Sequence, residues 1–549
     1  MKKTFRLFLT LLLMAASVPN MMAQDQQLTA EQMAKKADEA LKWLTKAAEA
    51  GKTSAQMSLA RMYKEGKMVA QSYEEAIRWY EKAAKKNKYA LVCLKEIYEE
   101  MGSQSDAADL YNLGELFLDE NIYQQAEECF LISAEKGNTD AMNRLGLLHA
   151  NKKEYTEAVK WYRMAAEKGH ASAMYNLALN YEEGNGVAKD GQEAAKWYRM
   201  AAEKGNTDAM NRLGLLYANK KEYTEAVKWY RMAAEKGHAS AMYNLALNYE
   251  DGNGVAKDGQ EAAKWYRMAA EKGDTDAMDR LGLLHENKKE YTEAVKWYRM
   301  AAEKGHASAM FSMGKMYAEG NGVAKDSQEA VKWYRMAAEK GYALAMYRMG
   351  EMYAKGNGVA KDYQEAVKWY HMAAEKGYDN AMYRMGEMYA EGNGVAKDGQ
   401  EAVKWYRMAA EKGNKWGMFD MGKMYAKGNG VAKDYQEAVK WYRMALEVDK
   451  DNYTAMYMIG ELYYLRGLTK RGLPDDKKEL KGEVVDFDKG DGLNSFAEAQ
   501  KWFNKVIETC NRISEDAKTP QLGKAAAVMM SGNAEMYLGI VKKAIDRGK

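Results

Sequence analysis

The stretch Gly392–Gly413, GNGVAKDGQEAVKWYRMAAEKG, joins a glycine-rich turn to a run with helical spacing. The turn GNGVAKD occurs six times, each time before such a run. A turn of this kind can cradle a phosphate or can simply connect two helices. Asp398 and Glu401 form a capping-box pattern at the expected helix start. The carboxylate of Asp398 would repel a phosphate, and no Ser or Thr follows the lysine as it does in a nucleotide-binding P-loop. The turn is therefore predicted to be a structural hinge.

The turn belongs to a unit that repeats along most of the chain. Between Trp161 and Trp441 the pattern A-x-x-W-Y recurs every 32 or 36 residues, and the shorter form replaces GNGVAKD with a turn four residues shorter. Each unit has two stretches with helical spacing of apolar residues. One helix pair is too small to enclose a core, whereas stacked pairs can share one. The sequence therefore predicts an all-α solenoid of helix-turn-helix repeats. Counting close variants, the pattern falls at Trp43, Trp79, Trp161, Trp197, Trp229, Trp265, Trp297, Trp333, Trp369, Trp405, Trp441 and Trp502, and Cys129–Phe130 fill a thirteenth place.

Three ordered features of this unit resemble the Sel-one-like repeat, a relative of the tetratricopeptide repeat. They are A-M-x-x-[LM]-G-x-[LM]-Y, G-N-G-V-x-K-D and E-A-x-K-W-Y-x-x-A-A-E-K-G. The resemblance covers nearly all of residues 30–512, and the pattern is broken near Cys129 and after residue 464. It implies a right-handed, tetratricopeptide-like superhelix that binds proteins or peptides, usually without chemistry of its own. Many bacterial members look like exported adaptors.

The chain is expected to contain five segments. The central one is a regular array of repeats, and the glycine in the middle of each first helix suggests very close contact with another helix. The last is expected to be a capping helix with a polar outer face, as terminal repeats require. The segments are residues 1–23 (signal peptide), 24–135 (divergent repeats), 136–448 (regular array), 449–512 (divergent repeat with an inserted loop, 466–495) and 513–549 (capping helix).

The first 23 residues have the pattern of a secretory signal peptide. Lys2, Lys3 and Arg6 precede a short apolar run, and Ala23 fits a cleavage point. We therefore expect a periplasmic or secreted protein. Without this segment the chain has 79 basic and 79 acidic residues (82 − 3 and 79 − 0). The charges are interspersed, so no nucleic-acid partner is expected, and no later segment is apolar enough to span a membrane.

Metal and cofactor chemistry finds little support in the sequence. The three cysteines lie far apart, and whether any of them pair is left open. His170, His238 and His306 are 68 residues apart and fall in different repeats, which argues against a shared metal site. A weak calcium-loop pattern lies in the insertion, although Ser495 with Glu498 fits a capping box equally well. No cofactor is expected. The weak calcium candidates are Asp486, Asp488, Asp491 and Glu498.

An enzyme is the first alternative to a binding protein. Ser133 with Lys136, and Ser312 with Lys315, match the S-x-x-K pattern of a serine nucleophile. Some cysteine-rich relatives have been linked to β-lactam binding, but neither S-D-N nor K-T-G accompanies these matches. A cell-wall-linked enzyme, a β-lactam-binding protein and a purely structural spacer therefore stand as alternatives to a non-enzymatic scaffold.

A partner-binding surface is predicted from differences between the repeats. In the first helix of each unit, the Ala, Met, Gly and Tyr positions barely change, and the positions between them vary. Helical spacing places the variable positions on one face, which we expect to line a concave groove. Aromatic and arginine side chains are common interface anchors, so a protein or peptide partner is expected. The predicted groove residues are Tyr175, Asn176, Arg212, Tyr243, Asn244, Arg280, Phe311, Tyr347, Arg348, Glu351, Tyr383, Arg384, Glu387, Phe419, Asp420, Lys423 and Tyr457.

Overall fold

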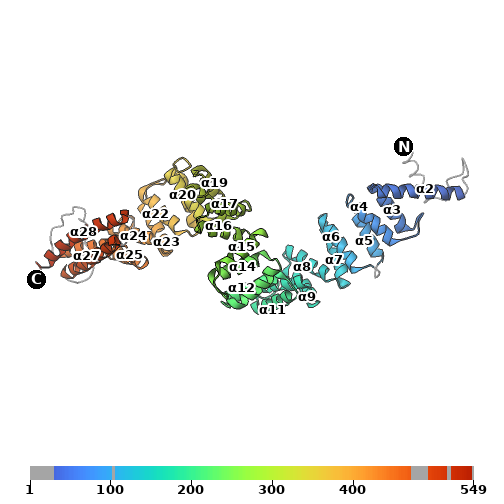
Figure 1. Cartoon of the computed structure of the whole chain (residues 1–549), viewed down its shortest axis with the longest axis horizontal. Helices are drawn as coiled ribbons and strands as arrows, with labels where there is room; N and C mark the ends of the chain where they lie inside the picture. The colour runs from blue at the N-terminus through green and yellow to red at the C-terminus, as the bar shows by residue number, and fades with distance from the viewer. Residues whose placement is uncertain (1–29, 102–104, 471–491, 516–520, 547–549) are drawn as a thin grey trace. The chain divides into compact units, whose positions relative to one another are not determined.

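The computed structural model describes residues 30–101, 105–470, 492–515 and 521–546. Within these ranges every regular element is an α-helix, which confirms the all-α prediction (Figure 1). None of the described helices is both long enough and apolar enough to cross a membrane. The signal-peptide prediction lies outside the described residues, and so does most of the inserted loop.

Most helices of the repeats are 13 residues long, and the last three are longer. They are α2 (Ala30–Glu49), α3 (Thr53–Glu65), α4 (Tyr73–Ala84), α5 (Tyr89–Met101), α6 (Ala107–Asp119), α7 (Tyr123–Glu135), α8 (Thr139–Asn151), α9 (Tyr155–Glu167), α10 (Ala171–Glu183), α11 (Gly191–Glu203), α12 (Thr207–Asn219), α13 (Tyr223–Glu235), α14 (Ala239–Asp251), α15 (Gly259–Glu271), α16 (Thr275–Asn287), α17 (Tyr291–Glu303), α18 (Ala307–Glu319), α19 (Ser327–Glu339), α20 (Ala343–Lys355), α21 (Tyr363–Glu375), α22 (Asp379–Glu391), α23 (Gly399–Glu411), α24 (Lys415–Lys427), α25 (Tyr435–Val448), α26 (Tyr453–Lys470), α27 (Gly492–Glu515) and α28 (Gln521–Asp546).

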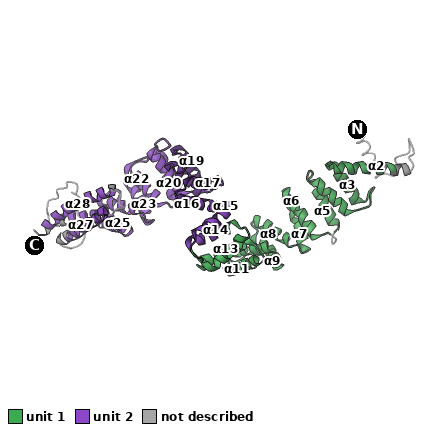
Figure 2. Ribbon diagram, viewed as in Figure 1, with its two compact units in different colours: residues 1–241, 253–256 green, residues 242–252, 257–549 purple. Residues whose placement is uncertain are grey.

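The chain divides into two compact units (Figure 2). Unit 1 contains residues 1–241 and 253–256, and unit 2 contains residues 242–252 and 257–549. In each unit, the first helix of a repeat packs on the second helix of the same repeat, and that second helix packs on the first helix of the next. Helix α5 has no tryptophan and was missed by the sequence pattern. It packs between α4 and α6 without a second helix of its own.

In most hairpins a buried tyrosine, rather than the tryptophan before it, fills the centre. Phe130 and Phe503 take this place in α6–α7 and α26–α27. Tyr370 is 2% exposed, whereas Trp369 is only partly buried. The tyrosine ring lies against the mid-helix glycine of the first helix. A Cβ atom added to Gly386 would be 2.5 Å from the ring of Tyr406. The predicted close contact at these glycines is therefore confirmed, since a side chain there would overlap the ring.

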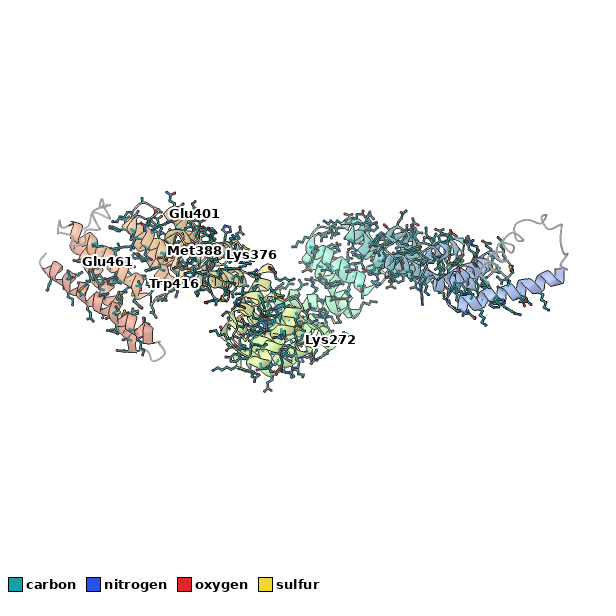
Figure 3. The ribbon with its side chains drawn as sticks, turned by 90° about the horizontal axis from the view of Figure 1, so that it is seen from above. Lys272, Lys376, Met388, Glu401, Trp416 and Glu461 are labelled. Atoms are coloured by element: carbon teal, nitrogen blue, oxygen red, sulfur yellow. The ribbon has the colours of Figure 1, made fainter. Side chains whose placement is uncertain are left out.

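The GNGVAKD turn is a hinge, as predicted. Gly392 has φ +82° and its N–H donates to the carbonyl oxygen of Met388. Gly394 has φ +74°, and an added Cβ would be 2.3 Å from the carbonyl oxygen of Tyr363 in the preceding repeat. Both glycines are therefore needed, the first for its backbone angle and the second also for its close approach to a neighbour. Met388 and Glu401, on the two helices that this turn joins, are labelled in Figure 3.

The predicted capping box is only half present. Asp398 accepts hydrogen bonds from the backbone N–H groups of Gln400 and Glu401, at 2.9 and 3.1 Å. The N–H of Asp398, which Glu401 should satisfy, instead donates to the carbonyl oxygen of Tyr389 at 2.9 Å. Glu401 forms an ion pair with Lys404 at 2.6 Å. The turn brings the carbonyl group of Tyr389, near the end of the first helix, close enough to the N–H of Asp398 to replace the contact expected from Glu401.

The shorter turns use a lysine in place of glycine. Lys153, Lys221 and Lys289 have φ of +63°, +62° and +62°, a left-handed conformation that costs a residue with a Cβ atom roughly 1 kcal/mol. The helices that follow begin after Glu154, Glu222 and Glu290, whose side chains accept no capping hydrogen bond. The shorter turn therefore lacks both the glycine and the cap of the longer one. This difference was not foreseen.

The C-terminal helices correct two expectations. Helix α27 begins at Gly492, so Ser495 lies inside the helix and is not a capping residue. The calcium candidates Asp486, Asp488 and Asp491 lie outside the described residues, and Glu498 is 3.7 Å from the ammonium group of Lys501. Helix α28 packs on α26 and α27, and its outer face is largely apolar, with Lys543 exposed on it, instead of the polar face that was expected.

The three cysteines are free and buried. Burial raises the pKa of Cys129 to about 12 and that of Cys510 to about 11, and it also raises the pKa of Cys93. Thiols in such surroundings stay protonated near neutral pH and react slowly. The cysteines therefore act as small core residues.

Candidate binding surface

The seventeen predicted groove residues all lie on first helices, and we call them the ladder. Within the described residues, unit 1 contributes only three of them, so most of the ladder belongs to unit 2. They are placed as follows: Tyr175 and Asn176 on α10, Arg212 on α12, Tyr243 and Asn244 on α14, Arg280 on α16, Phe311 on α18, Tyr347, Arg348 and Glu351 on α20, Tyr383, Arg384 and Glu387 on α22, Phe419, Asp420 and Lys423 on α24, and Tyr457 on α26.

The aromatic rings of the ladder are half-buried rather than freely exposed. Tyr347 packs on the buried Tyr370 of its own hairpin, with ring centroids 5.7 Å apart, and on Tyr378 at 5.2 Å. Phe419 packs on Tyr442 in the same way, at 5.3 Å. One side of each ring therefore belongs to the core of its repeat, and only the remainder is available to a partner. Sequence variation alone could not separate these two contributions.

Hydrogen bonds along the ladder connect the first helices of adjacent repeats. In unit 2, such a bond joins α22 to α24. The hydroxyl group of Tyr383 lies 3.0 Å from Glu387 and 3.1 Å from Asp420 on α24. In unit 1, the side-chain amide of Asn176 on α10 donates to the side-chain oxygen of Asn143 on α8 at 3.0 Å. The ladder therefore holds neighbouring repeats together as well as forming a surface.

Charges in the ladder of unit 2 are layered. Arg348, Arg384 and Lys423 pair with Glu351, Glu387 and Asp420, at 2.6, 2.7 and 2.6 Å. The three carboxylate side chains are 11, 23 and 12% exposed, whereas their cationic partners are 48, 36 and 42% exposed. Solvent, or a partner, therefore meets positive groups first, with their counter-charges beneath them.

Burial and charge together keep Tyr383 protonated. Burial, followed by the negative charges of Asp420 and Glu387, raises the pKa of the Tyr383 hydroxyl far above its usual value. The Tyr383 hydroxyl is therefore uncharged around neutral pH. On α18, beside the ladder, the hydrogen bond to Glu286 raises the pKa of Lys315.

A hollow of about 230 Å³ opens between α18 and α20, beside the ladder. Phe311 and Tyr334 form its aromatic part, and Lys315, Arg348 and Lys355 bring cations to it. Its carboxylates include Glu351, which pairs with Arg348 and also with Lys355 at 3.3 Å. The hollow is large enough for one side chain of a partner and too small for a drug-sized ligand.

The S-x-x-K serines are both engaged in structural contacts. Ser133 is fully buried, and its hydroxyl donates to the carbonyl oxygen of Ala107 at 2.5 Å. Ser312 lies near the hydroxyl of Tyr298, and Lys315 pairs with Glu286 at 2.7 Å. Neither serine is paired with its lysine in these contacts. The geometry therefore gives no support to a nucleophilic role.

The three equivalent histidines are helix caps. His170 accepts a hydrogen bond from the N–H of Ala173 through Nδ1, while Nε2 lies 3.0 Å from Asp140 of the preceding repeat. His238 and His306 make the same pair of contacts. Within the residues that the structure describes, no group of three or more His, Cys, Asp or Glu side chains is placed to hold a metal ion.

The chain belongs to the Sel1 repeat family, because matches to this repeat cover more than half of its length. A tetratricopeptide repeat also matches residues 111–173. Proteins of this repeat class generally act as scaffolds for protein interactions, and their fold is typically not that of an enzyme. The Sel1 repeat matches are residues 31–52, 53–88, 171–206, 207–238, 239–274, 275–306, 307–342, 343–378, 379–414, 417–448 and 454–478.

Solved structures of other repeat proteins are similar to this chain. One is c5321, described as a protective antigen present in uropathogenic Escherichia coli strains displaying an SLR fold. It is 29% identical over 87% of this chain and 98% of its own, with a TM-score of 0.53. A Sel1 repeat protein from Oxalobacter formigenes is 32% identical over 54% of this chain and 87% of its own, with a TM-score of 0.43. Comparison with the curated proteins gives no match.

Proposed function

We propose that this chain is a non-enzymatic scaffold or adaptor that binds an extended, carboxylate-bearing protein segment along the ladder of unit 2. The observation that carries the proposal is the layering of charge on α20, α22 and α24. There, three cations lie outermost, each over a carboxylate that is less than a quarter exposed. Half-buried aromatic rings lie beside these cations on the same helices.

This arrangement favours a partner that supplies carboxylates. Arg348 and Arg384 each carry five N–H donors, more than their ion pairs with Glu351 and Glu387 can use. An arriving carboxylate can therefore bond to the exposed part of the guanidinium group without breaking the pair beneath it. The same arrangement, an exposed cation over its paired carboxylate, recurs on three successive first helices. A segment crossing these helices could therefore be held at several points.

We also propose that the protein acts in the bacterial envelope or outside the cell. The support is the pattern of residues 1–23, with three positive charges before a short apolar run. The similar E. coli protein c5321 is described as a protective antigen, which suits an exported protein. A fusion of residues 1–30 to alkaline phosphatase should be active in the periplasm. Activity lost on replacing Leu11, Leu12 and Leu13 with Arg would support export, and an inactive fusion would contradict it.

The ladder can be tested by neutralising whole ion pairs. Replacing Tyr347, Tyr383 and Phe419 with Ala would remove core contacts and would not isolate binding. Instead, Arg348→Gln with Glu351→Gln, Arg384→Gln with Glu387→Gln, and Lys423→Gln with Asp420→Asn remove each cation together with its carboxylate. No buried charge is left unpaired, so the repeats should stay folded.

A matched control exists on the second helices of the same unit. Glu329 with Lys332, Glu365 with Lys368, and Glu401 with Lys404 are exposed pairs with the same three-residue separation. Wild type, the ladder variant and this control should be presented to a displayed random-peptide library. We expect acidic peptides to be enriched by the wild type and the control and lost by the ladder variant. Equal enrichment by the ladder variant, or none by the wild type, would contradict the proposal and favour a structural spacer.

A further inference from the structure

The hollow between α18 and α20 lies beside a phenylalanine of the ladder, at a place where the next first helices carry tyrosine. At the fifth position of the helix, α20 and α22 have Tyr347 and Tyr383, whereas α18 has Phe311. Between α22 and α24, the Tyr383 hydroxyl group reaches across to Asp420 at 3.1 Å. Because Phe311 has no hydroxyl group, it cannot make the equivalent contact with α20. The hollow of about 230 Å³ opens at this place.

Arg348 on α20 lies at the position that corresponds to Asp420 on α24, and it lines the hollow. Its guanidinium group donates to Glu351 at 2.6 Å, and 48% of its side chain remains exposed. A guanidinium group has more N–H donors than this one pair uses. Phe311, on the other side of the hollow, cannot supply an acceptor. A group that enters the hollow can therefore accept from Arg348.

The remaining walls of the hollow favour an aromatic ring. Phe311 and Met352 are half-buried, so part of each side chain is open to an occupant, and Tyr334 lies deeper in the lining. Aromatic side chains pack well on other rings and on the sulfur of methionine. Lys315 and Lys355 also line the hollow, and ammonium groups are attracted to the face of an aromatic ring.

Two carboxylates in the lining favour a neutral occupant over a charged one. Glu351 already accepts from Arg348 and Lys355. Glu319 accepts from the side-chain amide of Asn321 at 2.8 Å. A carboxylate that entered the hollow would meet both of these like charges at close range. A phenol hydroxyl group avoids this repulsion, because it can donate to a carboxylate and accept from a guanidinium group.

We propose that the hollow between α18 and α20 binds a tyrosine side chain of the partner. The ring packs on Phe311 and Met352, and the hydroxyl group meets Arg348 at the place that a ladder tyrosine would otherwise reach. This inference rests on the proposed function, because it names the anchor residue of the same carboxylate-bearing segment. The partner's carboxylates then meet the cations of α20, α22 and α24. An aromatic anchor in a pocket commonly contributes a large part of the affinity of an interface.

The test uses a peptide library in which one randomised residue has three glutamates on each side. The full-length wild-type chain should enrich tyrosine at the random position, ahead of phenylalanine, leucine and glutamate. Phe311→Tyr places the chain's own hydroxyl group in the hollow and should remove this preference. It should also weaken binding of the synthetic peptide Glu-Glu-Glu-Tyr-Glu-Glu-Glu roughly tenfold, to the affinity of the matching alanine peptide, measured by fluorescence anisotropy. Because tyrosine already occupies this position in α20 and α22, the variant should fold normally.

Phe419→Tyr is the matched control, because it makes the same change at the equivalent position of α24. Phe419 packs with Met458 on the C-terminal core and does not line the hollow. This control should keep the preference for tyrosine. Ala318→Leu is a second variant that fills the hollow from another wall, and it should act like Phe311→Tyr.

The outcomes separate this inference from the proposed function. A wild-type chain that enriches acidic peptides without a preference for tyrosine would overturn the inference and leave the proposed function standing. So would a preference for glutamate at the random position, or a preference for tyrosine that survives in both filled variants. A wild-type chain that enriches none of the peptides would overturn both.

Discussion

Hairpin α12–α13 of unit 1 and hairpin α22–α23 of unit 2 have the same kind of core packing. They differ in the turn that joins their two helices. In both hairpins, 13-residue helices meet where a glycine lies under a tyrosine ring. An added Cβ would be 2.4 Å from Tyr230 at Gly214 and 2.5 Å from Tyr406 at Gly386. The first hairpin turns through a left-handed lysine, Lys221, and the second through GNGVAKD.

The comparison shows that the turn can change length without moving the core. The longer turn adds a side-chain cap at Asp398 and a contact between Gly394 and the preceding repeat. The shorter turn has neither, and Lys221 is held in a conformation that glycine adopts more easily. The array thus tolerates two turn lengths because its stability depends mainly on contacts between helices.

The largest effects should come from the shared core. Tyr230→Ala and Tyr406→Ala each remove a buried ring and should destabilise their own hairpins by about 3–5 kcal/mol. Hydrogen exchange of the two hairpins, measured by mass spectrometry, should show similar losses of protection. A much smaller loss at one of them would break the claim that both hairpins have the same core.

The second largest effect should come from the contact between the longer turn and the preceding repeat. Gly394→Ala forces a Cβ against the Tyr363 carbonyl and also requires an unfavourable φ, so we expect a loss of about 2 kcal/mol. The loss should appear as faster exchange in both α21 and α22–α23. Gly191→Ala is the control, because an added Cβ meets nothing within 4 Å there and the φ angle is ordinary. It should be neutral or slightly stabilising.

Removing the capping residue should lower stability at the longer turn and change it little at the shorter one. Asp398→Ala should cost about 1 kcal/mol, because two backbone N–H groups lose their acceptor. Glu222→Ala, at the equivalent place in the shorter turn, should change stability little, since its side chain accepts no capping hydrogen bond. Glu401→Ala should also have a small effect, because this side chain pairs with Lys404. Urea unfolding and local exchange would measure all three, and equal losses would show that the cap is not the cause.

The smallest expected effect is a gain. Lys221→Gly relieves the left-handed conformation, and after the entropy cost of glycine it should stabilise the hairpin by about 0.5 kcal/mol. Lys220→Gly is the matched control, since Lys220 has φ −81° and gains nothing from glycine. It should be slightly destabilising. A melting temperature that falls in both variants would mean that the strain at Lys221 is negligible.

The sequence predicted most of the fold but less of the candidate surface. Repeat spacing, helix faces, the hinge and the close contact at Gly386 all follow from local patterns repeated many times in one chain. The ladder residues were found because they vary between repeats, yet their half-burial and their bonds to neighbouring repeats were not predicted. Helix α5 was missed because it carries no tryptophan.

By itself the sequence determined that helices form, where most of them end and that neighbouring repeats must shelter each other's apolar faces. Periodicity and turn chemistry act over a few residues, so they can be read directly. Only the tertiary structure decided that tyrosine fills most hairpin cores instead of tryptophan, that Tyr389 replaces Glu401 at the cap, and that the outer face of α28 is left largely apolar. Those outcomes depend on which atoms of other helices come within contact distance, and that distance is set by packing between repeats.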